Sequence, residues 1–158
     1  MLGQSILANM SLPNLDRFSS FCRINKHAEL KETLKYYQSL LIKAPNVSAI
    51  VNSLSGGNQQ KVVISKWLMS EPRILILDDP TRGIDVGAKY EIYKLMNQLA
   101  ESGMSIIMIS SELEEVLGMS DRVMVMCAGR SNGTLPISEA TQQTIMARAT
   151  GLINETTR

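Results

Sequence analysis

The fold is decided by one stretch of the sequence, Arg73-Ile74-Leu75-Ile76-Leu77-Asp78-Asp79. Four consecutive branched aliphatic residues without polar alternation are typical of a strand covered on both faces, as in a parallel sheet. The two aspartates then stand at the carboxyl end of that strand, where open α/β sheets bind their ligands. The stretch therefore predicts a buried strand that presents two carboxylates at the edge of the sheet.

Helical and strand patterns alternate after this stretch. Residues 86–101 predict a helix that ends at Ser102-Gly103, and the apolar runs 105–109 and 122–127 predict two more strands, with a short helix over 112–117 between them. The inward residues of the first helix are expected to be Ile92, Leu95, Met96 and Leu99. Strand, helix, strand, helix, strand is the order of an α/β layer with right-handed crossovers.

Helices dominate the sequence before residue 73. Residues 5–10 predict a short helix followed by a loop, residues 26–42 a longer helix ended by Ala44-Pro45-Asn46, and the turn-rich residues 53–60 open a helix that ends near Glu71-Pro72. The expected apolar faces are Leu30, Leu34, Tyr37 and Leu41 on the longer helix, and Val63, Ile64, Trp67 and Leu68 on the next. After Gly129 the pattern weakens, and a last helix is expected over 138–149, with the final seven residues frayed.

Composition narrows the classes of function. The 158 residues suffice for one core, and 44% of them are hydrophobic. Sixteen basic and fifteen acidic residues leave a net charge of +1, which argues against a nucleic-acid footprint. No apolar run reaches the ~18 residues of a membrane span. Cys22 and Cys127 lack metal-ligand spacing, so reduced thiols in a cytosolic protein are expected.

Ser55-Gly56-Gly57, directly before a helix, is suited to binding an anion. Its glycines allow close approach of the backbone, the start of the helix presents free N–H groups, and Ser55 adds a hydroxyl. Taken alone, the same three residues also fit a flexible loop with an N-cap.

The pair Asp78-Asp79 suits phosphoryl chemistry, because one carboxylate can hold Mg²⁺ while its neighbour orients or deprotonates a water. Alternatively, Asp79-Pro80 only begins a turn. A receiver domain also places paired acids at a strand end, but it would not explain the glycine loop before them.

Three motifs in order resemble the ATPase of ABC transporters. They are Leu54-Ser55-Gly56-Gly57-Asn58-Gln59-Gln60-Lys61, then Pro80-Thr81-Arg82-Gly83-Ile84-Asp85-Val86-Gly87-Ala88-Lys89, then Ser110-Ser111-Glu112-Leu113 with Ser120-Asp121-Arg122-Val123. These motifs are most similar to the second ATPase domain of the double-domain subunits of bacterial carbohydrate importers. This group of importers includes those for ribose, galactosides, xylose and autoinducer-2. The resemblance covers almost the whole chain.

The resemblance implies roles for single residues. Leu54–Gln60 would be the signature motif, with Asn58 where other ABC families usually carry Gln, and residues 82–85 would be the D-loop. The expected nucleotide-binding residues are Ser55, Gly56, Gly57, Asn58, Gln59 and Asp85. Asp78 would be the Walker B magnesium ligand, Asp79 stands at the position of the catalytic Glu, and Ser111 at that of the switch His.

The resemblance also implies a fold, a partial P-loop NTPase with a mainly parallel sheet and a remnant of the helical subdomain. Residues 1–70 would belong to the helical subdomain that meets the permease, 71–130 to the RecA-like core, and 131–158 to a C-terminal extension of strand and helix.

Two departures from the family pattern bear on catalysis. Asp79 is one methylene shorter than Glu, and a misplacement of about 1 Å can cost ~10²-fold in rate. Ser111 can hydrogen-bond a phosphate, but it lacks the charge and the proton shuttle of an imidazole. We therefore expect the composite site that uses this Walker B strand to be weak or silent. The alternative is that Asp79 still supports slow hydrolysis.

A third departure is an absence. The sequence contains no Gly-x-x-x-x-Gly-Lys-Ser/Thr phosphate loop, and the family's Q-loop region would lie before Met1. Met1 is consequently interpreted as an internal start or a truncation. The chain alone is expected not to hold ATP or to hydrolyse it.

The leading hypothesis is a fragment of the ATP-binding component of an importer for a sugar or sugar-like solute, using ATP and Mg²⁺. Its partners would be another ABC ATPase domain, a membrane permease and, indirectly, a periplasmic solute-binding protein, at the cytoplasmic face of the membrane. One alternative is a catalytically inactive, ABC-derived interaction module. Another is a non-transport ABC ATPase of the DNA-repair or translation type, which residues 81–88 disfavour.

Overall fold

The computed structural model describes residues 1–21 and 23–153. Cys22 and most of the tail that was expected to fray lie outside these described residues. The chain divides into two compact units, Met1–Ile107 and Met108–Arg158. Each unit is described by itself below.

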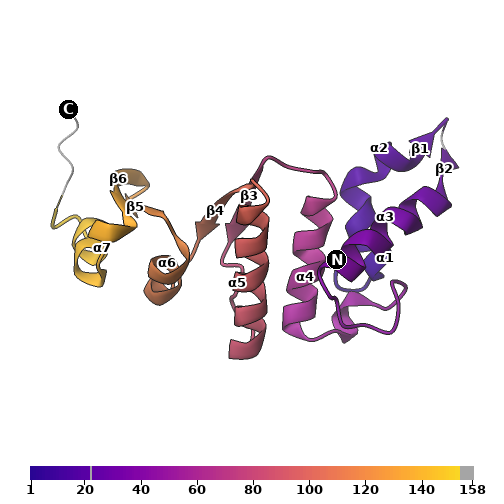
Figure 1. Ribbon diagram of the computed structural model, residues 1–158, viewed down its shortest axis with the longest axis horizontal. Coiled ribbons are helices and arrows are strands. Elements are labelled where there is room, and N and C mark those ends of the chain that lie inside the picture. The colour runs from indigo at the N-terminus through magenta and orange to yellow at the C-terminus, as the bar shows by residue number, and fades with distance from the viewer. Residues whose placement is uncertain (22, 154–158) are drawn as a thin grey trace. The chain divides into compact units, whose positions relative to one another are not determined.

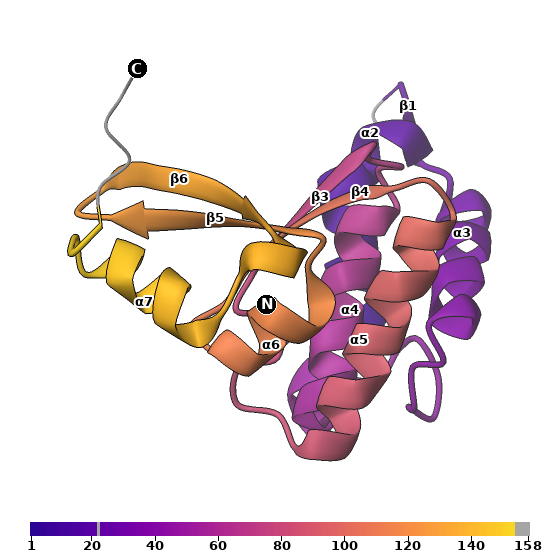
Figure 2. The same ribbon diagram turned by 60° about the vertical axis from the view of Figure 1, so that its left-hand side comes forward.

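The first unit is mainly helical, and Figures 1 and 2 show its helices α3, α4 and α5 side by side. Its elements are α1 (Ile6–Ser11), η1 (Leu12–Asn14), α2 (Leu15–Phe18), β1 (Ser19–Ser20), β2 (Arg23–Ile24), α3 (Lys26–Ser39), η2 (Val51–Ser53), α4 (Gly56–Leu68), β3 (Ile74–Asp78), α5 (Val86–Glu101) and the first part of β4 (Ser105–Ile109), a strand that crosses the boundary between the units. Helices α1, α3 and α5 all contact α4. The helix that follows the predicted glycine loop is therefore the centre of this unit.

Apolar side chains from these helices form the core. Ile6 and Met10 of α1, Ile64 of α4 and Ile92 of α5 are fully buried. The bounds of α5 agree with the sequence-based expectation, and its inward face does as well, because Ile92 and Met96 are buried while Leu95 and Leu99 are half-buried. Gly103, with φ +94°, ends this helix and directs the chain into β4.

The expected face of the helix over 26–42 was only partly right, because Leu34 and Tyr37 are half-buried while Leu30 and Leu41 are exposed. Helix α3 ends at Ser39, and its buried residues are Glu29 and Thr33, whereas Leu30 is 38% exposed. Leu41 leaves the helix with φ +50° and is 72% exposed. Helix α3 buries the side that contacts α1 and α4. The spacing of its apolar residues alone did not identify that side.

The expected face of α4 was also partly wrong. Ile64 and Leu68 are buried as predicted, but Val63 and Trp67 are each about half exposed, at 46% and 49%. Lys61 and Ser65 are buried in their place. Because α1, α3 and α5 all pack against α4, residues outside a single apolar face are buried as well. Among them are the small residue Ser65 and the ion-paired Lys61.

The strand at 74–78 forms as predicted and lies beside β4 as its hydrogen-bonded neighbour. The N–H of Ser105 donates to the carbonyl of Arg73 at 3.1 Å. The expectation that both faces of this strand are covered was wrong. Leu75 and Leu77 are buried, whereas Ile74 and Ile76 are 57% and 64% exposed, because the described residues of the first unit cover one face of the strand only.

The second unit contains α6 (Leu113–Met119), β5 (Arg122–Cys127), β6 (Arg130–Pro136), η3 (Ile137–Glu139) and α7 (Gln142–Ala149). Val123, Val125 and Ile145 form its buried core. Figure 2 shows α7 running along the β5–β6 pair. Cys127, at the end of β5, is a free thiol.

Strand β5 pairs antiparallel with β6, with Arg122 opposite Pro136. The hairpin turn uses Ala128 and Gly129 at φ +48° and +77°, which matches the twist of paired strands. The last helix begins at Gln142 rather than 138, because Thr141 and Thr144 form a capping box there.

Candidate functional site

The predicted anion loop leads into the first turn of α4. Ser55 is the N-cap residue, with φ −61° and ψ 154°, but its side chain makes no capping hydrogen bond to the helix backbone. The side-chain amide of Gln59 donates to the carbonyl of Leu54 at 2.9 Å, which closes the loop on itself. Ser55 and Gly56 are exposed, while Gly57 is buried and Asn58 and Gln59 are half-buried. Ser55 is thus exposed at the start of the helix, and its hydroxyl makes no hydrogen bond to the helix backbone.

The two glycines of this loop lie against the start of α5 and the residues just before it. A Cβ on Gly56 would lie 3.1 Å from Cγ2 of Ile84, and a Cβ on Gly57 would lie 2.6 Å from Cβ of Ala88. Real Cβ atoms do not approach so closely, so glycine is required at position 57 for the close packing of α4 on α5. The structure thereby brings the predicted signature residues next to the predicted D-loop.

Asn58 connects Ser55 to the turn at residues 41–43. Its Nδ2 donates to Oγ of Ser55 at 2.8 Å, and its Oδ1 accepts from the backbone N–H of Lys43 at 2.8 Å. Both ends of the amide are therefore engaged inside the protein. The sequence predicted that Asn58 binds nucleotide, and in the structure its amide contacts Ser55 and the backbone of Lys43.

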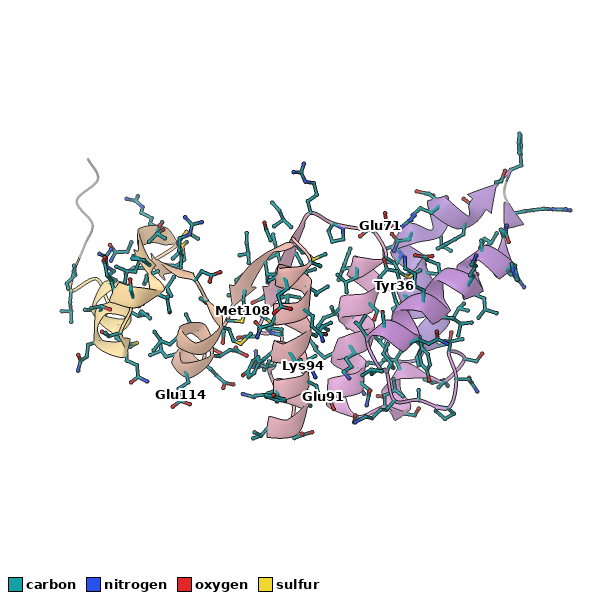
Figure 3. The ribbon with its side chains drawn as sticks, in the orientation of Figure 1. Tyr36, Glu71, Glu91, Lys94, Met108 and Glu114 are labelled. Atoms are coloured by element: carbon teal, nitrogen blue, oxygen red, sulfur yellow. The ribbon has the colours of Figure 1, made fainter. Side chains whose placement is uncertain are left out.

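An ion-pair cluster links α4, α5 and the turn at residues 41–43. Nζ of Lys61 lies 2.8 Å from Oε2 of Glu91, and Nζ of Lys43 lies 3.2 Å from Oε1 of the same carboxylate. The side chain of Lys61 is only 7% exposed, and its ammonium also donates to the carbonyl of Leu41 at 3.3 Å. Figure 3 shows Glu91 on α5, the helix that packs against α4.

The two lysines lower the pKa of Glu91 below its ordinary value of 4.5, first through the hydrogen bond from Lys61 and then through that from Lys43. Sequence reasoning missed this cluster. Lys61 stands inside the quoted signature text, but nothing in that text indicates that position 91, thirty residues later, carries its partner.

Asp78 and Asp79 occupy the end of β3. Asp78 is exposed, and Asp79 is half-buried with φ +43°, a left-handed conformation that Asp tolerates better than most residues. The carbonyl of Asp79 accepts from the N–H of Arg82 at 3.1 Å, and the two central residues of this turn, Pro80 and Thr81, are buried. Asp79 therefore begins a turn, and Asp78 is the more exposed residue of the pair.

The remaining predicted residues lie on two further segments. Asp85 is the N-cap of α5, where its Oδ1 accepts from the N–H of Ala88 at 2.9 Å. Ser111 is exposed and belongs to the second unit, between β4 and α6. The contacts of the first unit thus join the signature loop to residues 83–88, while Ser111 stands in the other unit.

A separate hollow of about 420 Å³ lies at the opposite ends of α3, α4 and α5, lined by Tyr36, Leu40, Leu68, Glu71, Leu99 and Met104, among others. Tyr36 and Glu71 are labelled in Figure 3. Burial raises the pKa of the Tyr36 hydroxyl above its ordinary value. This hollow contains none of the predicted site residues.

Within residues 1–21 and 23–153, no three His, Cys, Asp or Glu side chains gather in a group that could hold a metal ion. None of the helices described there has both the length and the hydrophobicity that crossing a bilayer requires.

Comparison with known proteins identifies relatives of this chain. The sequence profile described as ABC transporter matches residues 2–82. A xylose import ATP-binding protein of Thermoanaerobacter pseudethanolicus is 60% identical over 143 residues, which are 90% of this chain and 28% of that protein. A ribose import ATP-binding protein of Clostridium perfringens is 52% identical over 155 residues, 98% of this chain and 31% of that protein. The chain spans about three tenths of the length of these relatives.

Solved structures share the fold. A nucleotide-free ATP-binding cassette from an ABC transporter matches with a TM-score of 0.73 at 22% identity, covering 85% of this chain and 56% of that one. A dimeric, post-hydrolysis ATP-binding cassette bound to ADP and Pi matches with a TM-score of 0.70 at 22% identity, covering 87% and 58%. These likenesses confirm the predicted partial P-loop NTPase fold of the ABC ATPase type.

Proposed function

The chain belongs to the ABC transporter family, and from this premise we propose that it supplies the signature motif to ATP held by another ATPase domain. The proposed setting is the ATP-binding component of an importer for a sugar or sugar-like solute. The names of the relatives, import proteins for xylose and ribose, support this choice of solute class.

The observation that carries the proposal is the exposed hydroxyl of Ser55 at the start of α4. The hydroxyl makes no capping bond, and the first turn of a helix presents N–H groups that have no partner within the helix. Together they form a surface of donors suited to an anionic phosphate. Gly57 packs on Ala88 and so fixes the start of α4 against the start of α5.

Ser55, Gly56 and Gly57 are proposed to contact the terminal phosphate. Asn58 and Gln59 are proposed to belong to the same nucleotide-binding motif. Asp85 is proposed to take part from the neighbouring segment, where its carboxylate is anchored by the N–H of Ala88. This anchoring means that a change at Asp85 disturbs the start of α5 as well as any nucleotide contact.

Asp78 is proposed to bind Mg²⁺, and Asp79 to stand at the position of the catalytic acid. An exposed carboxylate at a strand end fits a magnesium ion that keeps several waters and is shared with phosphates. Such an ion would neutralise developing charge on the phosphates. Asp79 and Ser111 differ from the Glu and His of the family, so this half's own hydrolytic site is proposed to be weak or silent.

The proposed partners are another ABC ATPase domain, a membrane permease and, through the permease, a periplasmic solute-binding protein, with no nucleic acid. Association with the cytoplasmic face of the membrane would come through the permease. In the proposed division of labour, residues 1–70 face the permease, 71–130 carry Asp78, Asp79, Asp85 and Ser111, and 131–158 form an extension.

A reconstitution tests the proposal. The purified chain is mixed with a separately expressed ABC ATPase domain that carries a phosphate loop, and ATP turnover and complex formation are measured. We expect no turnover by the chain alone, and ATP-dependent association with the second domain. ATP turnover by the chain alone would contradict the need for a partner's loop. Association with the second domain that is indifferent to nucleotide would favour the inactive interaction module instead.

A further inference from the structure

The side chain of Asn58 has an orientation that its neighbours determine. A backbone N–H can only donate, so the N–H of Lys43, 2.8 Å away, must face the carbonyl oxygen Oδ1 of Asn58. The amide nitrogen Nδ2 then necessarily faces Ser55. The assignment of the two amide ends therefore follows from the hydrogen-bond network.

This orientation decides what the hydroxyl of Ser55 does. Because Nδ2 of Asn58 donates at 2.8 Å, Oγ of Ser55 is the acceptor of that bond. A serine hydroxyl has one proton, which is not used toward Asn58, and the hydroxyl of Ser55 has no other hydrogen-bond partner among the described residues. The proton of Ser55 is consequently available to donate outward from the exposed loop.

The donor that sets this polarity is held firmly in place. The turn carrying Lys43 is bound twice to the helices beside it, by Nζ of Lys43 to Glu91 at 3.2 Å and by Nζ of Lys61 to the carbonyl of Leu41 at 3.3 Å. Lys61 in turn pairs with Glu91 at 2.8 Å and is nearly buried. These bonds restrain the turn that presents the backbone N–H of Lys43 to Asn58.

We propose that Asn58 is a positioning residue, which fixes the hydroxyl of Ser55 as a hydrogen-bond donor toward the terminal phosphate of a partner-held nucleoside triphosphate. The proposal rests on the proposed function. An ionised phosphate oxygen only accepts hydrogen bonds. Because Ser55 accepts from Asn58, its proton is left to donate to such an oxygen. Were Ser55 to donate to residue 58, it would turn lone pairs toward the phosphate, and the contact would become repulsive.

The variant Asn58→Asp reverses the polarity with almost no change of shape. A carboxylate still accepts from the N–H of Lys43, but it also accepts from Ser55 and draws that proton inward.

The measurement is the affinity of the chain for a separate ABC ATPase domain with its own phosphate loop, loaded either with a non-hydrolysable ATP analogue or with ADP. Loss of a bond to a charged group predicts binding to the triphosphate-loaded domain about 10- to 100-fold weaker. Binding to the ADP-loaded domain should not change, whereas general damage to the fold would lower both.

The added charge of Asp is controlled by a double-mutant cycle with Ser55→Ala. If Asn58 acts through Ser55, Asn58→Asp should weaken triphosphate-dependent binding by less than about 3-fold in the Ser55→Ala background. An equal loss in both backgrounds would mean direct repulsion of the phosphate and would overturn the proposal. Asn58→Ala, which adds no charge, leaves the proton of Ser55 unconstrained and should show a smaller, triphosphate-specific loss. Full binding by both variants at position 58 would also overturn it.

The same measurement on the unsubstituted chain distinguishes failure of the Asn58 proposal from failure of the proposed function. If that chain does not distinguish the triphosphate-loaded from the ADP-loaded domain, the proposed function fails. If it does distinguish them, and Asn58→Asp distinguishes them equally well, only the role of Asn58 fails.

Discussion

Gly57 and Ala88 meet so closely that a methyl group on Gly57 would lie 2.6 Å from the Cβ of Ala88. Gly57 belongs to the first turn of α4 and Ala88 to the first turn of α5. The signature loop and the segment after Asp79 are thus in direct contact at the points where their helices begin. A displacement of one helix start must move the other, because packed interiors leave no free volume to absorb it.

This contact predicts that Gly57→Ala destabilises the chain. Alanine is ordinarily the better residue in a helix, by roughly 0.5–1 kcal/mol, but here its methyl group would force α4 and α5 apart at a cost of about 1–3 kcal/mol. Thermal or urea unfolding measures the difference. The matched control is Gly118→Ala in α6, where no atom lies within 4 Å of the added Cβ and stability should rise. A Gly57→Ala chain as stable as the parent would show that the helices separate freely.

The second prediction concerns acid stability and Glu91. Its pKa is lowered in the folded state by Lys61 and Lys43, so its contribution to stability is fully present above the unfolded value of 4.5 and is lost as the pH falls through the folded pKa. Glu91→Gln should therefore cost about 1 kcal/mol at neutral pH, since it leaves the nearly buried ammonium of Lys61 without its counter-ion. The difference from the parent should shrink as the pH falls below about 4.5.

Unfolding by urea at a series of pH values from neutral to acidic tests this prediction. Glu32→Gln is the control, because Glu32 pairs with the exposed Lys35 one turn away on α3, and such surface pairs contribute at most about 0.5 kcal/mol. A constant difference between Glu91→Gln and the parent at every pH would refute an ionic origin.

Thr33 supplies a third prediction. Its side chain is fully buried on α3, and its hydroxyl has no hydrogen-bond partner among the described residues. Thr33→Val removes this unsatisfied group and keeps the branched shape, so the free energy of unfolding should rise by about 1 kcal/mol. Thr144→Val should act in the opposite direction, because the hydroxyl of Thr144 forms the capping box of α7 with Thr141. Calorimetric melting of the two variants compares them directly, and a destabilised Thr33→Val would imply a polar partner for this hydroxyl.

The fourth prediction separates the signature loop from the carboxylates of β3. If the chain acts in trans on ATP held by another domain, Ser55→Ala should reduce the turnover of the mixture by at least about 10-fold, as expected for the loss of a hydrogen bond to a charged group. Asp79→Asn should leave turnover at that nucleotide unchanged, because Asp79 is proposed to serve the other composite site. A steady-state phosphate-release assay of the mixture measures both. An equal loss in the two variants would place Asp79 at the same nucleotide as Ser55.

Local patterns predicted several elements closely. The strands at 105–109 and 122–127 and the helix at 86–101 have the bounds expected from the sequence, because uninterrupted apolar runs and a regular helical period depend on neighbouring residues only. The strand β6 was not delimited, since Ser131, Asn132 and Gly133 carry no strand signal. Asn132 is nevertheless buried and donates to the carbonyls of Arg148 and Ile153, so contacts with α7 stabilise it there.

The sequence by itself determined the family, the order of its motifs and the two departures at Asp79 and Ser111. Those features consist of residue identity and spacing, which a chain carries before it folds. Only the tertiary structure decided that Gly57 packs on Ala88, that Lys61 pairs with Glu91, and that Asn58 supports Ser55. Each of these relations depends on distances between groups, down to a few tenths of an ångström, and on which end of an amide faces which neighbour. Such distances arise only when α4, α5 and the turn at 41–43 pack together.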